Sequence, residues 1–142
     1  MFIKIPALEI KVICLYVIGL NSLVAHNFEK ISLLQAFNSL HKFDLICISE
    51  SYLDSTFSDN DPSLALNGYK LVGSDHPNNI KRGVVCIYYK QSLSIQFLNI
   101  TNLTECLIFK IVYNNKKCFI ISLYRSPSQA AYEFDWFIYK LD

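Results

Sequence analysis

Hydrophobic positions in the first 50 residues follow a strand pattern, then a helix pattern, then a strand pattern again. Val12–Leu20 is a short apolar run rich in β-branched residues, as is typical of a strand covered on both faces. Phe28–Leu40 carries apolar residues at three-residue steps after Asn27, a suitable N-cap, which predicts an amphipathic helix. Asp44–Ser49 is a second strand of the buried type. Since a strand–helix–strand unit brings its two strands side by side in parallel, we expect an α/β start to the domain.

The second part of the chain has a different pattern. Residues 51–67 are rich in Ser, Asp, Asn and Pro, which predicts a long surface loop. From Gly68 onward, turn-forming residues separate short apolar runs, and Asn114–Lys117 bridges the last two as a hairpin loop would. These runs predict a mixed sheet meander of five strands: Tyr69–Gly73, Val84–Tyr89, Ser94–Leu98, Cys106–Tyr113 and Cys118–Tyr124. A final helix is predicted over Ser128–Leu141, and because it is apolar nearly all round, we expect more protein to cover it.

Composition points to one folded domain without a strong charge. The chain has 142 residues, of which 52% are hydrophobic, and its formal net charge is +1. No Pro/Gly-rich linker divides residues 1–142, so we treat them as a single unit. Because there is no global positive field to hold a polyanion, any binding of nucleic acid must rely on a local site.

The N-terminal residues and the cysteines bear on the cellular setting. Lys4, Glu9 and Lys11 interrupt the apolar N-terminal region, and the run after them is about half of a bilayer span, so a buried strand is favoured over a signal peptide or membrane anchor. The five cysteines are odd in number, have no C-x-x-C spacing and stand inside apolar runs: Cys14, Cys47, Cys86, Cys106 and Cys118. We therefore expect buried, reduced thiols in an intracellular protein, nuclear or cytoplasmic, with no membrane partner.

Glu50 is the acidic residue whose position suggests chemistry. It follows the strand Asp44–Ser49 directly, where a carboxylate is costly unless it faces a cation or a hydrogen-bond donor. Asn21 ends the first strand in the same way, so parallel strands bring both side chains to one sheet edge, where α/β sheets bind ligands. Such oxygen atoms suit Mg²⁺, and Tyr124 is a candidate to donate its hydroxyl to a phosphate at this edge. The alternative is that Glu50 caps the turn or pairs with a surface lysine.

Other candidate sites have less support. The three histidines, His26, His41 and His76, have no metal-ligand spacing, which argues against zinc. Lys81-Arg82-Gly83 is a small basic turn that is either a phosphate contact or a solvated loop. The sequence has neither a Gly-rich phosphate loop nor a G-x-S-x-G motif, so nucleotide binding and serine hydrolysis are not indicated.

Several segments of the chain, in order from about residue 12, resemble one known family. The segments are Asn21-Ser22-Leu23, Phe43–Asp54, Asn67–Leu71, Arg82–Tyr89 and Ser122–Ser128. They resemble the endonuclease/exonuclease/phosphatase family, and within it the N-terminal endonuclease domain of jockey-type non-LTR retrotransposon polyproteins. The resemblance implies a partial four-layer αββα sandwich with mixed β-sheets. It also implies Mg²⁺- or Mn²⁺-dependent phosphodiester hydrolysis that nicks target DNA, with the rest of such a polyprotein as a partner.

The resemblance assigns roles to individual residues. Glu50 matches the metal-binding glutamate of the family, Asn21 an active-site position that is often Asp or Asn, and Tyr124 the tyrosine that contacts the scissile phosphate. Arg82 and Arg125 are the candidates for contacts with the DNA backbone. The resemblance thus predicts one site in which a metal ion and the DNA phosphate meet.

The sequence also departs from the family. Gly19 and Ser128 stand where the family usually has asparagine, and the chain ends before the family's Asp-x-Asn and Asp-His motifs. We therefore expect an N-terminal fragment that is inactive alone. Two alternatives remain open, a phosphatase-type member of the same superfamily and a non-catalytic remnant whose exposed sheet edge binds a protein.

Overall fold

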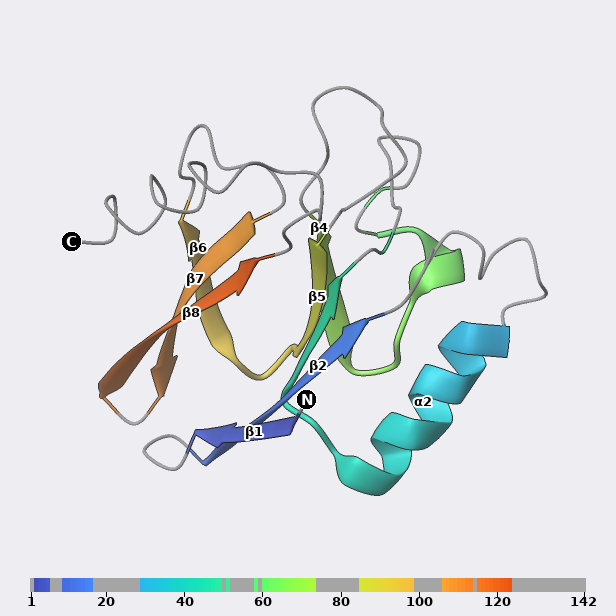
Figure 1. Cartoon of the computed structure of the whole chain (residues 1–142), viewed down its shortest axis with the longest axis horizontal. Coiled ribbons are helices and arrows are strands. Elements are labelled where there is room, and N and C mark those ends of the chain that lie inside the picture. The colour runs from blue at the N-terminus through green and yellow to red at the C-terminus, as the bar shows by residue number, and fades with distance from the viewer. Residues whose placement is uncertain are drawn as a thin grey trace.

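The computed structural model describes residues 2–5, 9–16, 29–49, 51, 58, 60–73, 85–98, 106–113 and 115–123. They form two β-sheets and one long helix, α2 (Glu29–His41) (Figure 1). The first sheet contains, in spatial order, β1 (Phe2–Ile5), β2 (Ile10–Tyr16), β3 (Leu45–Ser49), β5 (Val85–Lys90) and β4 (Tyr69–Gly73). The second sheet contains β6 (Ser94–Leu98), β7 (Cys106–Tyr113) and β8 (Lys116–Leu123).

The first sheet begins with the predicted strand–helix–strand unit. β2 and β3 pair in parallel, with Val12 opposite Leu45 at one end and Tyr16 opposite Ser49 at the other. β1 pairs antiparallel with β2, so the apolar N-terminal region holds two strands rather than the single strand predicted there. β3 and β4 both pair antiparallel with β5. The result is a mixed sheet, and the prediction that β2 and β3 are adjacent and parallel is confirmed.

Helix α2 matches the predicted bounds within one residue, but its predicted apolar face is only partly right: Ile31 and Leu34 pack on the core, whereas the last apolar residues do not. Ile31 and Asn38 are buried, whereas Leu40 is 81% exposed and Phe37 is 40% exposed. An α-helix turns by about 100° per residue, so positions three residues apart drift around its axis, and the nine-residue step from Ile31 to Leu40 amounts to about 180°. Asn38, seven residues after Ile31, returns to the same side. The buried face of the helix therefore includes a polar residue and excludes the last apolar ones.

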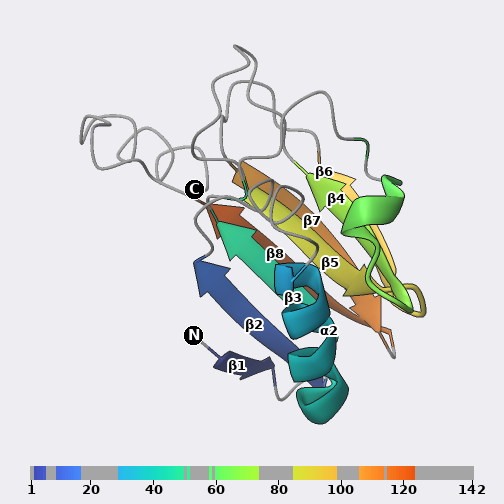
Figure 2. The same cartoon turned by 90° about the vertical axis from the view of Figure 1, so that its right-hand side faces the viewer.

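Two apolar clusters lie on the opposite faces of the first sheet. On one face, Ile46 and Ile48 of β3 pack with Ile31 of α2. On the other face, Leu45 and Cys47 pack with residues of the second sheet such as Phe109. The helix, the first sheet and the second sheet are thus three stacked layers (Figures 1 and 2), which agrees with the predicted mixed α/β sandwich. β3 is buried on both faces, as its continuous apolar sequence predicts.

The five strands after Gly68 divide between the two sheets and do not form one meander. β4 and β5 join the first sheet, and only β6, β7 and β8 form a meander of their own. The hairpin between β7 and β8 is tighter than predicted, because Tyr113 is already paired with Lys116. Asn115 in this turn has a φ of 61°, a left-handed conformation that asparagine tolerates better than most residues.

Part of the predicted surface loop 51–67 belongs to the core. A short 3-10 helix, η1 (Pro62–Leu64), begins at Asp61, whose carboxylate accepts hydrogen bonds from the Ser63 backbone N–H (2.8 Å) and hydroxyl (2.6 Å). Leu64 and Leu66 are 1% and 3% exposed, because they pack on the helix-covered face of the first sheet. The prediction of a surface loop missed these two apolar residues because most of the segment is polar.

The remaining predictions on the fold concern cysteines, membrane segments and the two ends of the chain. All five cysteines lie in described strands and none forms a disulfide, but only Cys47 and Cys86 are buried, while the other three are partly exposed. No helix within the described residues is long and apolar enough to cross a membrane. The N-cap Asn27 and the helix Ser128–Leu141 lie outside the described residues.

Candidate functional site

The carboxyl ends of three strands meet at one edge of the molecule. β2 and β3 run in parallel to the paired residues Tyr16 and Ser49, and β8 ends on the same side (Figures 1 and 2). The predicted strand ends are therefore brought together. The five side chains predicted for the site lie outside the described residues: Asn21, Glu50, Arg82, Tyr124 and Arg125.

A direct contact joins the two sheets near this edge. The Ser122 side chain of β8 lies close to Cys47 of β3, where it partly offsets the rise in the pKa of the Cys47 thiol. Ser122 and Cys47 stand one and two residues before the described ends of their strands, at Leu123 and Ser49. The carboxyl ends of β3 and β8 are therefore neighbours across the interface between the sheets.

Ser51 defines the path of the chain just after β3. Its exposed fraction is 0%, although serine is a polar residue that is usually exposed. Ser51, two residues after the end of β3, therefore lies inside the protein.

The opposite end of β3 is held by Asp44. Its carboxylate accepts a hydrogen bond from the Lys11 backbone N–H of β2 (2.8 Å) and forms an ion pair with Lys90 of β5 (2.6 Å). Backbone bonds from Asp44 N–H to the Lys11 carbonyl (2.8 Å) and from Lys90 N–H to the Asp44 carbonyl (3.0 Å) complete the connection. Asp44, which belongs to one of the family-like segments, thus fixes three strands at the end remote from the predicted site.

A second polar connection fixes the helix to the first sheet. The Asn38 side chain accepts a hydrogen bond from the Phe43 N–H (3.1 Å) and donates one to the Tyr69 hydroxyl (3.0 Å), which in turn donates to the Phe43 carbonyl. These bonds tie the end of α2 and the start of β3 to β4. Sequence reasoning missed Asn38, because a single asparagine in an amphipathic helix gives no signal that it is buried.

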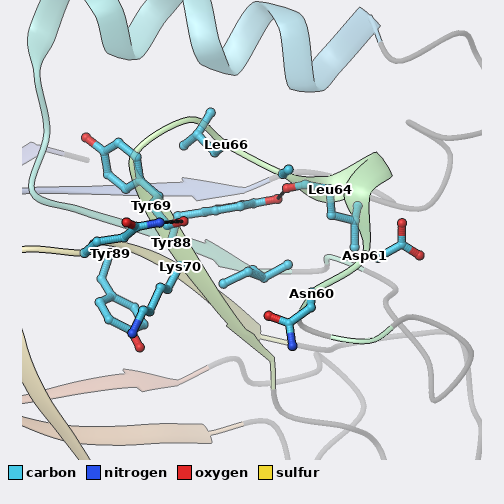
Figure 3. Close-up of a pocket in the computed structure, with 11 residues that line it drawn as sticks. Asn60, Asp61, Leu64, Leu66, Tyr69, Lys70, Tyr88 and Tyr89 are labelled. Atoms are coloured by element: carbon cyan, nitrogen blue, oxygen red, sulfur yellow. Dashed lines mark hydrogen bonds between the residues drawn. The ribbon is translucent and has the colours of Figure 1, made fainter.

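A pocket of about 520 Å³ lies beside the edge strand β4 (Figure 3). Asn60, Asp61 and Lys70 contribute polar groups, and Tyr88 forms part of the wall. The Tyr88 hydroxyl donates a hydrogen bond to the Leu64 carbonyl (2.7 Å), and burial raises the pKa of this tyrosine, so it acts as a structural tie.

The described side chains do not include a cluster of metal-ligating groups. Within the ranges that the structure describes, no group of three or more His, Cys, Asp or Glu side chains is placed to hold a metal ion. Any cation at the strand-end edge therefore depends on residues beyond those ranges, of which Glu50 is the carboxylate next to β3.

The comparisons with known proteins concern the fold. No family model matches the chain, and no curated protein sequence matches it. Among solved structures, the chain is similar to the AP endonuclease LMAP from Leishmania major, with a TM-score of 0.69 and 19% sequence identity. The match covers 93% of this chain and 45% of that one, so the chain spans less than half the length of the AP endonuclease. At this identity the likeness concerns architecture alone: the two sheets and their covering helix share the fold of part of that AP endonuclease.

Proposed function

We propose that this chain is the N-terminal part of a metal-dependent DNA endonuclease domain, of the kind found in jockey-type non-LTR retrotransposons. The observation that carries the proposal is the parallel pairing of β2 and β3 up to Tyr16 and Ser49. Because of this pairing, the segments that lead to Asn21 and Glu50 leave the sheet from adjacent strands at the edge where α/β folds bind ligands.

Glu50 is the proposed metal ligand. Mg²⁺ and Mn²⁺ prefer oxygen ligands, and one or two carboxylates with water and substrate phosphate usually complete the Mg²⁺ site. Glu50 follows Ser49 directly and precedes the buried Ser51, so it stands at a well-packed strand end, and Asn21 adds an amide oxygen. A bound cation would stabilise the negative charge that develops on the phosphate oxygens during hydrolysis.

Tyr124 is proposed to contact the scissile phosphate. Ser122, two residues before it, lies close to Cys47, three residues before Glu50. This contact between the sheets supports a common edge for Tyr124 and Glu50. Arg82 and Arg125 are proposed to bind the DNA backbone, since a chain with a net charge of +1 needs local positive charge for this purpose.

The proposed DNA substrate and the proposed retrotransposon origin are supported by different observations. A DNA substrate is supported by the fold shared with a protein described as an AP endonuclease. The retrotransposon assignment rests on the family-like segments of the sequence, among them Arg82–Tyr89 and Ser122–Ser128. A coding sequence that continues into a reverse transcriptase would support this assignment over a phosphatase-type relative.

Binding of Mn²⁺ to the full chain tests the proposed metal site. We expect Glu50→Gln to weaken binding at least tenfold, because it removes the carboxylate charge with little change in shape. Glu9→Gln, at an exposed position before β2, is the matched control and should leave the affinity unchanged. A folded chain that binds no Mn²⁺, or that binds it equally after both substitutions, would contradict the proposal and favour a non-catalytic, protein-binding role.

A further inference from the structure

Cys14 and Cys47 stand directly opposite each other on the parallel strands β2 and β3. Paired residues in a sheet point to the same face, and both cysteines pack in the cluster between the two sheets. Neighbouring strands are about 4.8 Å apart, which lies within the range of about 4.4–6.8 Å between the Cα atoms of a disulfide. The Cα spacing of the pair is therefore compatible with a disulfide without a change in strand register.

The two thiols also interact with each other. The neighbouring Cys47 thiol lowers the pKa of Cys14 to about 6, although burial opposes the shift. The interaction with Cys14, followed by burial, raises the pKa of Cys47. Cys14 is partly exposed and Cys47 is buried, so one sulfur is the accessible nucleophile and the other is its protonated neighbour.

The remaining cysteines are not placed to pair with Cys47. Cys86 packs on the opposite, helix-covered face of the first sheet. Cys118 lies four residues before Ser122 on β8, about 13 Å away at the rise of a strand, and Ser122 is the residue that contacts Cys47. Successive residues of a strand point to opposite faces of the sheet. Leu107 points into the space between the sheets, so its neighbour Cys106 points away from it.

We propose that Cys14 and Cys47 are an oxidisable dithiol, in which a peroxide attacked by Cys14 leads to an intramolecular disulfide between β2 and β3. In the first step the Cys14 thiolate attacks one peroxide oxygen, the O–O bond breaks, and protonation of the other oxygen releases water or an alcohol. In the second step the Cys47 sulfur attacks the resulting sulfenic acid, an S–S bond forms, and the hydroxyl leaves as water with the Cys47 proton. The two sulfurs together lose two electrons, which the peroxide accepts.

The expected consequence is a covalent link between the two strands that lead to the proposed metal site. Cys14 and Cys47 precede the described ends of β2 and β3 by two residues each. The dithiol rests on the strand register and stands whether or not the chain binds metal or DNA.

Peptide mapping of the peroxide-treated full chain tests the inference. After reduction, removal of the reductant, treatment with hydrogen peroxide and alkylation of remaining thiols, trypsin releases each cysteine in a separate peptide. Cys14 lies in Val12–Lys30 and Cys47 in Phe43–Lys70. We expect these two peptides as the main disulfide-linked product, with a mass lower by two hydrogen atoms than their sum.

Variants of the same chain separate the pair from general oxidation. Cys47→Ala should abolish the linked product. Because it also removes the neighbour that lowers the pKa of Cys14, the sulfenic acid on Cys14 that dimedone traps should form more slowly than the disulfide does in the unchanged chain. Cys106→Ala should leave the linked product unchanged. A main product that links Cys14 to Cys118, a disulfide dimer of two chains, or full alkylation of both Cys14 and Cys47 after peroxide would overturn the inference.

Discussion

Replacing Phe119 with threonine is expected to leave the fold intact and to reduce the binding of a hydrophobic dye. Phe119 lies on the outer face of β8, where it is 62% exposed, and Ile121, Val112 and Leu123 are also exposed beside it or on the neighbouring strand. A fully exposed phenylalanine side chain has an accessible surface of about 200 Å², so about 120 Å² of Phe119 is in contact with water. At about 25 cal/mol per Å², burying this surface would contribute about 3 kcal/mol of free energy. A face of this kind should bind dye and promote association of chains.

Phe109→Thr is the matched control for this prediction. Phe109 lies on β7, next to the strand that carries Phe119, but it is 0% exposed between the two sheets. Its loss should cost about 3–5 kcal/mol, a large part of the stability of a typical domain. The assays are far-UV circular dichroism, dye fluorescence and thermal melting of the full chain, which we expect to melt broadly. Equal destabilisation by both substitutions, or a sharp two-state melt of a monomer that binds no dye, would show that the outer face is covered.

Three further predictions concern a buried hydroxyl, a thiol and catalysis. Tyr88→Phe leaves the buried Leu64 carbonyl without its hydrogen-bond partner and should cost about 1–3 kcal/mol of stability. Amide exchange over residues 60–66 should accelerate while exchange in the β7–β8 hairpin stays the same, and unchanged exchange over residues 60–66 would contradict a structural role for this hydrogen bond. The alkylation rate of Cys14 should rise with pH through about 6 and then level off. Burial raises the pKa of Cys106 to about 11, so its alkylation rate should still increase at pH 9, and parallel pH profiles for the two cysteines would contradict the prediction. Residues 1–142 with Mg²⁺ or Mn²⁺ should not nick supercoiled plasmid above background, because catalytic groups that act together lose most of their activity when some of them are absent. Metal-dependent nicking that disappears in Glu50→Gln would contradict this prediction.

Local patterns in the sequence were enough to predict most strands. β4, β6 and β7 have the predicted bounds, because apolar runs separated by turn residues are a local signal. The partition of these strands between two sheets was not predictable, since it depends on long-range pairings such as Ser49 with Val85. The buried face of α2 was partly mispredicted for another reason, because three-residue steps were read as a single face.

The common edge at which β2 and β3 end was predictable from the sequence. The order strand, helix, strand predicted that β2 and β3 end at one edge, and the pairing of Tyr16 with Ser49 confirms it. The opposition of Cys14 and Cys47 was not predictable, since a shift of one residue in strand register would place the two thiols on different faces of the sheet. The positions of Asn21, Glu50 and Tyr124 remain predictions.

The most direct test of the proposed site is NMR of the full chain with substoichiometric Mn²⁺, which broadens signals near the bound ion. We predict selective broadening of the amide signals at the carboxyl ends of β2, β3 and β8, namely Tyr16, Ser49 and Leu123, while the first residues of these strands stay sharp. Glu50→Gln should remove the selective broadening. Uniform broadening, broadening at the opposite ends of the strands, or the same pattern in Glu50→Gln would contradict a metal site at this edge.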